Sequence, residues 1–566
     1  MVKNALATDD FSINIVSDFL QSVVIVDDGA DFAPALHRAT PVAAAPEPQT
    51  PGKRTRFPKP RLKPPPKGEI ARQNVLDAKR VVDGFAERGI VCSILRPEKG
   101  EDTSDRTQKV ARRADILVLD WNFWGDNGET ARQLLRDVLG DDVRDNRRRL
   151  VAIYTAERDL DAIVRRVRDE LRSGKTGTIR VSGPYALDTG VARVVVLAKP
   201  ESVVAKSAGS ARKQVVAYEN LPDVLIEQFS TFMYGLVSNV ALKSIAALRS
   251  NTHPLLKRLG PDLDAGYLWH RAVQMYPQDA EEHLVDLVSA ELRAILDDSD
   301  VRQAAALPAI RQWLEKLRET DFSARFGETQ ARSINDVLLL LDLGSASKGA
   351  EAAKVLEKFP KMKARTAHRK TDQIAAFAPS KAAAVRSNEA FAVLASHRTQ
   401  YTKPQPHLTL GTIISAGTGK KRRYWLCLQP VCDTVRLAGA VKFPFLELHR
   451  AESGGFQFVL RASNRANVRL RIEVTPQNLT MLDFRPSTGT DCVISETRSG
   501  GFFFSRGNRR YRWEAELKRE HAQQFAEKLG REFSRIGLVE SEWLRLWGRE
   551  PVPQSPGEVL AQPTGE

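Results

Sequence analysis

Cysteine is scarce in this chain of 566 residues, which contains only four. A disulfide-stabilised secreted domain needs a much higher density of cysteine, so that class is excluded and a reducing compartment is favoured. The most apolar stretch, residues 228–242, is shorter than the roughly 20 residues that a membrane-spanning helix needs. The opening residues MVKNALATDDFS lack the apolar segment of a signal peptide. We therefore expect a cytoplasmic protein with no membrane partner.

Acidic residues are absent from residues 53–67, KRTRFPKPRLKPPPK, although the chain as a whole contains 70 of them. Much of the net charge of +15 lies in this segment. Its prolines oppose packing as a helix or a central strand, so we predict a solvated Pro-rich and basic insertion over about residues 33–68. A soluble linker is the simpler interpretation, and an arm that binds nucleic acid or another acidic partner is the alternative.

The length of the chain indicates several domains, because a single core does not grow to this size. Short apolar runs alternate with helical periodicity up to residue 200, helices dominate after it, and alternating aromatic-rich runs appear beyond residue 400. We predict an α/β domain, a helical domain, a flexible connector that includes one short helix, a mainly antiparallel β domain with terminal helices, and a disordered tail. Their boundaries are expected at 1–200, 201–343, 344–400, 401–549 and 550–566.

The α/β segment contains five apolar runs of strand length with helical segments between them. This alternation predicts a parallel sheet with helices on both faces. In such sheets ligands bind beyond the carboxyl ends of the strands. The residues at those ends are Asp27, Asp28, Asp120, Thr155 and Lys199. Three carboxylates converging on one edge would favour a cation with oxygen ligands, most plausibly Mg²⁺, and Lys199 would offset more of the negative charge.

This set of residues resembles the active site of the two-component response-regulator receiver domain, over residues 20–200. That family has an acidic pair after the first strand, a phosphoacceptor Asp after the third, Thr or Ser followed by Ala after the fourth, and Lys-Pro after the fifth. The corresponding residues here, in the same order, are Asp27-Asp28, Asp120, Thr155-Ala156 and Lys199-Pro200. Gly128 also lies eight positions beyond Asp120, as in the family's loop. The resemblance implies a flavodoxin-like fold.

The same resemblance implies a role for each residue. Asp27, Asp28 and Asp120, with the backbone carbonyl of Asn122, would hold Mg²⁺ while a phosphoryl group transfers to Asp120. Thr155 would hydrogen-bond the transferred group and Lys199 would pair with it. A phosphorylated Asp120 would then bias a two-state surface.

Two positions depart from the family pattern. Val196 stands where receivers carry an aromatic switch residue, and Trp124 stands where proline is common. The basic insertion also lies soon after the acidic pair. An alternative is therefore a receiver-shaped scaffold that is never phosphorylated and that docks a partner protein.

Residues 221–248 are apolar around most of a helical circumference, which predicts one central or dimerising helix and a homodimer through the helical region. We interpret His253, His270 and His283 as packing or surface residues rather than as phosphotransfer residues. In the β domain, Cys427 and Cys432 match no common zinc spacing and are interpreted as buried thiols.

The segment RGNRRYRW, residues 506–513, would suit stacking on nucleic-acid bases, yet a charge-protected edge strand has the same sequence pattern. Of these two interpretations, we favour the edge strand.

As a whole, the chain resembles large receiver-domain proteins of bacterial conflict and antiphage systems, which are paired with a GHKL-type ATPase or a histidine-kinase-like protein. We therefore predict a phosphorylation-responsive regulator whose receiver controls a C-terminal output module. The alternatives are the docking scaffold and a nucleic-acid-binding protein that uses the insertion and the C-terminal module. No activity beyond phosphorylation and dephosphorylation of the receiver itself is predicted.

Overall fold

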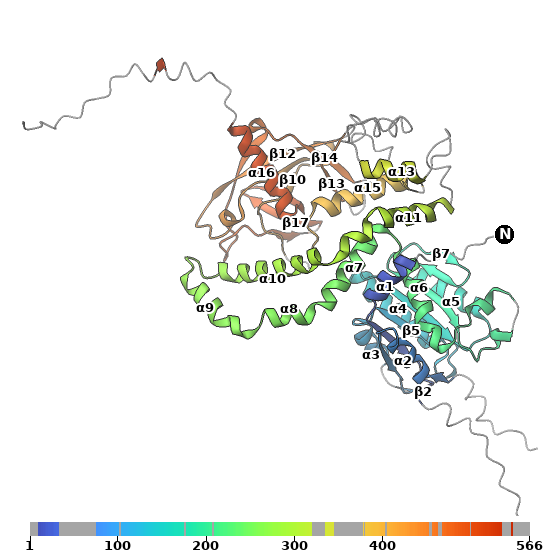
Figure 1. Cartoon of the computed structure of the whole chain (residues 1–566). Coiled ribbons are helices and arrows are strands. Elements are labelled where there is room, and N and C mark those ends of the chain that lie inside the picture. Colours follow the sequence, from blue (N-terminus) through green and yellow to red (C-terminus); the bar gives the residue numbers. More distant parts are fainter. Residues whose placement is uncertain are drawn as a thin grey trace, which may run out of the picture. The chain divides into compact units, whose positions relative to one another are not determined.

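The structure of the protein is a computed structural model, and its described part forms two compact units within residues 1–320 and 321–566 (Figure 1). It describes residues 10–32, 75–100, 103–174, 177–206, 209–319, 334–343, 377–378, 380–401, 405–451, 455–461, 467–498, 500–534 and 545–546. The predicted basic insertion, most of the predicted connector and the predicted tail lie outside these residues. Among the described helices, none combines the length and the apolar composition that crossing a bilayer requires.

A seven-stranded sheet forms the centre of the first unit. Its five parallel strands follow the spatial order β4-β1-β5-β6-β9, which is the 2-1-3-4-5 order of flavodoxin-like sheets. They are rich in Val, Ile and Leu because most of their residues are buried between two helical layers. Their bounds are β1 (Ser22–Val26), β4 (Val91–Leu95), β5 (Ile116–Leu119), β6 (Arg149–Thr155) and β9 (Ala192–Ala198).

The remaining two strands, β7 (Arg180–Gly183) and β8 (Ala186–Asp188), form an antiparallel hairpin that extends the sheet beyond β9. The sequence analysis did not predict this hairpin. A separate parallel pair, β2 (Ala30–Asp31) and β3 (Leu76–Asp77), joins the two ends of the segment that contains the insertion. The insertion therefore begins and ends at neighbouring points of the fold.

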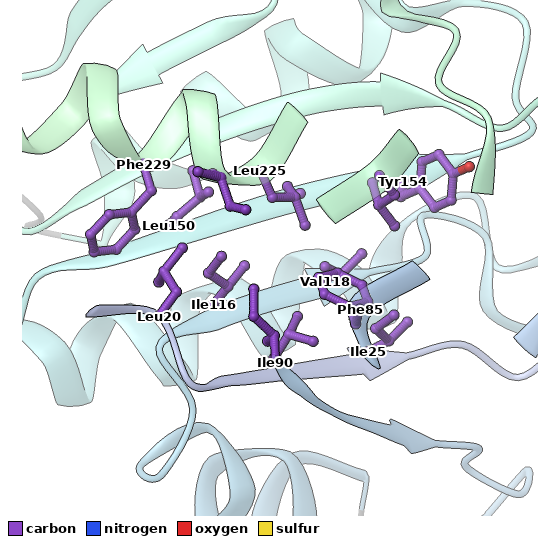
Figure 2. Packing of buried hydrophobic residues seen from close by; sticks show 14 of the residues in the cluster. Leu20, Ile25, Phe85, Ile90, Ile116, Val118, Leu150, Tyr154, Leu225 and Phe229 are labelled. Atoms are coloured by element: carbon purple, nitrogen blue, oxygen red, sulfur yellow. The ribbon is translucent and has the colours of Figure 1, made fainter. Parts of the chain in front are cut away.

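One face of the sheet is covered by α1 (Asp10–Phe19), α2 (Ala78–Ala86), α6 (Leu221–Met233) and α7 (Leu236–Ser250). Figure 2 shows Leu225 and Phe229 of α6 in the same apolar cluster as Leu150 of β6. The helices after residue 200 thus complete the core of the α/β fold. The opposite face is covered by α3 (Thr103–Ala111), α4 (Glu129–Arg144) and α5 (Leu160–Ser173).

The single helix expected over residues 221–248 is wrong, because α6 and α7 are separate helices. The chain breaks at Tyr234 and Gly235, and Gly235 has a φ of 153°, which favours glycine and lies outside the helical region. The break lets α6 pack on the sheet while α7 packs on α1. The following helices are α8 (Thr252–Arg258), α9 (Asp264–Val273), α10 (Asp279–Asp298) and α11 (Leu307–Glu319).

Short 3₁₀ segments connect these elements. They are η3 (Phe123–Gly125), η4 (Val203–Lys206), η5 (Ser210–Gln214), η6 (Tyr218–Asn220), η7 (Pro261–Leu263) and η8 (Asp300–Ala305).

The second unit is built on a nine-stranded antiparallel sheet, as the alternating sequence pattern predicts. Alternate residues of β11 face two different cores: Leu426 lies in one and Trp425 in the other. The strands are β10 (Thr412–Ala416), β11 (Arg423–Cys427), β12 (Val441–Arg450), β13 (Phe458–Leu460), β14 (Val468–Ile472), β15 (Leu479–Phe484), β16 (Glu496–Arg498), β17 (Gly501–Arg506) and β18 (Arg509–Glu516).

Helices complete the second unit: α13 (Ile334–Leu343), α15 (Lys381–Ser396) and α16 (Arg519–Phe533). The short 3₁₀ segments are η12 (Gly419–Lys421), η13 (Val431–Thr434) and η14 (Pro476–Asn478). Helix α15 is longer than the short helix expected before residue 400, and its Glu389 accepts a hydrogen bond from Arg469 of β14. The end of the predicted connector is thereby tied to the β sheet.

Candidate functional site

Backbone hydrogen bonds align the ends of the parallel strands at one edge of the sheet. The Asp120 N–H donates to the Val26 carbonyl at 2.9 Å, which places Asp120 beside the residue that follows β1. The Lys199 N–H donates to the Thr155 carbonyl at 2.8 Å, which places the ends of β9 and β6 side by side. The five predicted residues therefore lie at a common edge, as expected for a parallel sheet.

The ammonium group of Lys199 joins two of the predicted carboxylates. Its Nζ lies 2.7 Å from Asp27 Oδ2 and 2.9 Å from Asp120 Oδ1. The exposed fractions are 1% for Lys199, 2% for Asp27 and 5% for Asp120, so the three charges form a buried cluster. A buried charge is tolerated when it is paired and hydrogen-bonded, and this pairing meets that condition.

The backbone of the loop after β5 holds the other acidic groups in place. The Asn122 N–H donates to Asp120 Oδ2 at 2.9 Å, and the Trp124 N–H donates to Asp28 Oδ2 at 2.9 Å. On the other side, the Gly29 N–H donates to Asp27 Oδ1 at 2.8 Å. Both oxygens of Asp27 and both oxygens of Asp120 are therefore fixed in direction.

Thr155 and Asn122 each form a hydrogen bond with Glu157. The Glu157 N–H donates to Thr155 Oγ1 at 3.2 Å, and Asn122 Nδ2 donates to Glu157 Oε1 at 2.8 Å. Thr155 is buried at the end of β6, the strand next to β5, so its hydroxyl lies at the same edge as Asp120. Its recorded hydrogen bond is to the loop rather than to the carboxylate cluster.

The charges of the cluster shift its pKa values. Burial raises the pKa of Asp27 to about 6; Lys199 opposes this rise and the Asp120 charge adds to it. Burial likewise raises the pKa of Asp28. Burial alone would lower the pKa of Lys199, but attraction to Asp120 and Asp27 outweighs it and the pKa is raised. Lys199 is therefore a permanent cation at this edge.

Mg²⁺ suits the donor chemistry of this edge. Three carboxylates against one ammonium leave an excess of negative charge, and carboxylate and carbonyl oxygens are the ligands that Mg²⁺ prefers. Among the described residues, no three Asp, Glu, His or Cys side chains already form a cluster that could hold a metal ion. The ammonium of Lys199 instead bridges Asp27 and Asp120.

The two departures from the family pattern have clear places in the structure. Val196 is buried in the core between the sheet and helices α4 and α5. Trp124 has a φ of 51°, an uncommon conformation for a bulky residue. That backbone turn directs its N–H at Asp28, so the residue in the usual proline position supplies a donor that proline lacks.

Sequence reasoning missed several residues that support the site. Glu157 links the loops after β5 and β6, and its carbonyl also accepts a hydrogen bond from Ser202. Tyr218 donates to Glu201, two residues beyond Lys199, at 2.7 Å. The position of Glu157, two residues after the end of β6, was the one indication in the sequence. A contact between loops produces no periodic pattern of residues from which it could be predicted.

Within the described part of the chain, the other candidate residues form no second site. Cys427 is buried as predicted, whereas Cys432 is exposed and the expectation of a buried thiol there is wrong, because η13 carries it to the surface. His270 and His283 contact each other with ring centroids 4.9 Å apart, which fits the packing role predicted for them.

Comparison with known families gives one match. Residues 19–204, 186 of the 566 residues, match the family model of the response receiver domain. The match includes all five parallel strands and every residue of the candidate site. No curated protein and no solved structure matches the chain. The chain therefore carries a response receiver domain in its first unit, and the comparisons do not support the expected link to conflict and antiphage systems.

Proposed function

Because residues 19–204 form a response receiver domain, we propose that this protein is a phosphorylation-responsive signalling regulator that accepts a phosphoryl group on Asp120. The observation that carries the proposal is the buried cluster in which Lys199 contacts both Asp27 and Asp120. Stability alone does not require this cluster, because apolar residues of similar volume commonly replace a buried ion pair at no cost. Perturbed pKa values in such a cluster are typical of functional sites.

The positions of the side chains support the following reaction. A carboxylate oxygen of Asp120 attacks the phosphorus of a phosphohistidine or a small acyl phosphate, and the bond from phosphorus to the donor breaks with its electron pair leaving on the donor. Lys199, already beside Asp120 Oδ1, pairs with the new phosphoryl oxygens, and Thr155 donates its hydroxyl hydrogen to one of them. The product is an acyl phosphate on Asp120.

The residues that would hold Mg²⁺ are Asp27, Asp28 and Asp120, with the backbone carbonyl of Asn122. Mg²⁺ bound there would neutralise charge on the transferring group. The raised pKa values of Asp27 and Asp28 fit such a role, since they reflect burial first and then the nearby charge of Asp120, and a divalent cation would favour the charged form of both carboxylates.

The proposal is tested by incubating the full-length protein with a small acyl phosphate and Mg²⁺ and measuring its intact mass. We expect a single phosphoryl adduct on the wild type, none on Asp120→Asn, and loss of the adduct when Mg²⁺ is chelated. Asp126→Asn is the control in the same loop: Asp126 accepts hydrogen bonds from the start of α4 and should not affect labelling. An unlabelled wild type would reject the proposal, and a label on Asp120→Asn would move the acceptor elsewhere.

The receiver is proposed to act on the C-terminal β unit as an output module, with a histidine-kinase-like or GHKL-type ATPase protein as its partner. The scaffold alternative predicts partner binding that is unaffected by Asp120→Asn. The comparisons with known proteins give no information about the output role of the β unit or about the partner protein.

The nucleic-acid alternative depends on the basic insertion, which lies outside the described residues, and on the C-terminal strands. In the described strands, the basic side chains Arg498, Arg506 and Arg512 lie beside Glu496, Asp483 and Glu514, respectively. These pairs favour the interpretation of β16 to β18 as charge-protected strands. Deleting residues 53–67 and measuring the salt dependence of DNA binding would test the alternative.

A further inference from the structure

Helices α8, α9 and α10, residues 252–298, form a helical arm in which only Ala280 is buried. Figure 1 shows α8 and α10 as the two limbs of this arm with α9 at its turn. Every residue from 281 to 290 is exposed, although these residues are the middle of the 20-residue helix α10. A helix this exposed gains little from tertiary packing, which is the usual source of helix stability in proteins.

The exposed surface of the helical arm is strongly apolar. Trp269 is 72% exposed, Met275 85% and Val285 64%. Each side chain of this kind carries on the order of 100 to 200 Å², so together they expose roughly 1,000 Å². The exposed large apolar residues of the arm are Leu256, Leu263, Leu268, Trp269, Val273, Met275, Tyr276, Leu284, Val285, Leu287 and Val288.

Charged and histidine side chains join α10 to α8 and α9. Arg258 of α8 pairs with Glu291 of α10 at 2.9 Å, and Arg271 of α9 pairs with Glu281 at 2.7 Å. The rings of His270 and His283 also contact each other, tilted by 35°. The arm thus places charged groups in its own seam and apolar groups on its outside, where another molecule would cover them.

Charge complementarity identifies the molecule that fits. Helix α10 carries seven acidic residues and one arginine, whereas residues 228–261, which include all of α7 and α8, contain four basic residues and no acidic one. Two of these four, Arg249 and Arg258, already pair with Asp115 and Glu291 of the same chain, which leaves Lys243 and Lys257. Two copies related by a two-fold axis would bring each α10 against the basic α8 of the other copy, and each favourable contact would occur twice. The exposed apolar area also exceeds the roughly 800 Å² per partner of a stable interface.

We infer that the helical arm is a dimerisation surface, on which two copies of this chain pair their arms as a four-helix arrangement with α10 of one copy against α8 of the other. This inference does not depend on phosphorylation of Asp120. It assigns a surface, α8 to α10, to the homodimer that the sequence predicted through a different helix.

The test measures the mass of the full-length protein by sedimentation and light scattering across micromolar concentrations. The wild type should dimerise reversibly. Val285→Glu, on the outside of α10, should raise the dissociation constant about 100-fold or more, because two apolar contacts are lost per dimer. The matched control is Val181→Glu in β7, since Val181 is 59% exposed and lies outside the arm; it should leave the constant unchanged.

Thermal unfolding followed by circular dichroism checks that both variants fold, which is expected because both side chains are exposed. As a measurement without variants, hydrogen exchange of wild-type amides in residues 279–298 should slow as concentration rises. A monomer at every concentration overturns the inference, as does a dimer that Val285→Glu leaves intact. Protection of α10 that does not change on dilution also overturns it, because the arm would then be covered within one chain.

Discussion

Lys199, Asp27 and Asp120 lie at the edge of the receiver sheet, and the proposed chemistry is assigned to this cluster. A fully buried lysine is rare unless its charge is compensated, and here two carboxylates compensate it. The two carboxylates would repel a phosphoryl group, whereas the ammonium group of Lys199 would attract it. Substitutions of these residues should therefore affect the free energy of unfolding and the phosphorylation of Asp120 to different extents.

Replacing Lys199 with Met leaves Asp27 and Asp120 buried without their cation. We expect the free energy of unfolding at pH 7.5 to fall by about 3 kcal/mol, and by less below pH 6, where Asp27 takes up a proton. Chemical denaturation at the two pH values measures the difference. The control is Lys79→Met, which breaks an exposed ion pair with Asp83 and should change stability little. Equal losses for both variants would contradict a special role for the buried cluster.

Asp27→Asn should stabilise the protein in a pH-dependent way. The folded pKa of Asp27 is about 6 against 3.8 for the unfolded chain, so wild-type stability falls as pH rises from about 4 to 6 and is then constant. The shift corresponds to roughly 3 kcal/mol as an upper value. The variant should therefore gain about 2 kcal/mol over the wild type at pH 7.5 and almost nothing at pH 4, by denaturant titration.

The control for this prediction is Asp18→Asn, the same change from carboxylate to amide at an exposed position of α1. A gain for Asp27→Asn that is the same at pH 4 and pH 7.5 would show that burial and the Asp120 charge do not act on Asp27 as described.

At the scale of elements, the start of α4 depends on Gly128. Its φ is 89°, and a Cβ added there would lie 2.2 Å from the ring of buried Trp121. Gly128→Ala should destabilise the protein by about 2 to 4 kcal/mol through strain and overpacking. Gly125→Ala nearby, with φ 83° and nothing within 4 Å of the added Cβ, should lose only about 1 kcal/mol. Thermal or denaturant unfolding of the pair checks this, and equal losses would exclude the Trp121 contact as the cause.

The elements that the sequence predicted best are those with a clear physical period. The buried runs of β1, β5, β6 and β9 were visible because both faces of a parallel sheet are apolar. The β7–β8 hairpin was missed because its strands are short and β7 is largely exposed at the edge. The break between α6 and α7 was missed because an isolated glycine such as Gly235 is often tolerated within a helix.

At the scale of the whole molecule, the common position of Asp27, Asp120, Thr155 and Lys199 could be predicted, because strand ends in a parallel sheet share an edge. The contacts of Glu157 and Trp124 could not, since they depend on irregular loop backbone. The packing of α6 on the receiver sheet was also hidden, because an apolar helix does not indicate which surface it covers. The polar contacts within the helical arm could not be predicted either, because the sequence does not indicate which helices contact each other.

The most direct test of the central claim locates the phosphoryl group itself. Wild-type protein is treated with a small acyl phosphate and Mg²⁺ and then with borohydride, which reduces an aspartyl phosphate to homoserine, and its peptides are sequenced by mass spectrometry. The account predicts homoserine at position 120, dependent on Mg²⁺ and prevented by prior chelation. Homoserine at another carboxylate, or at none in protein shown to be folded, would contradict it.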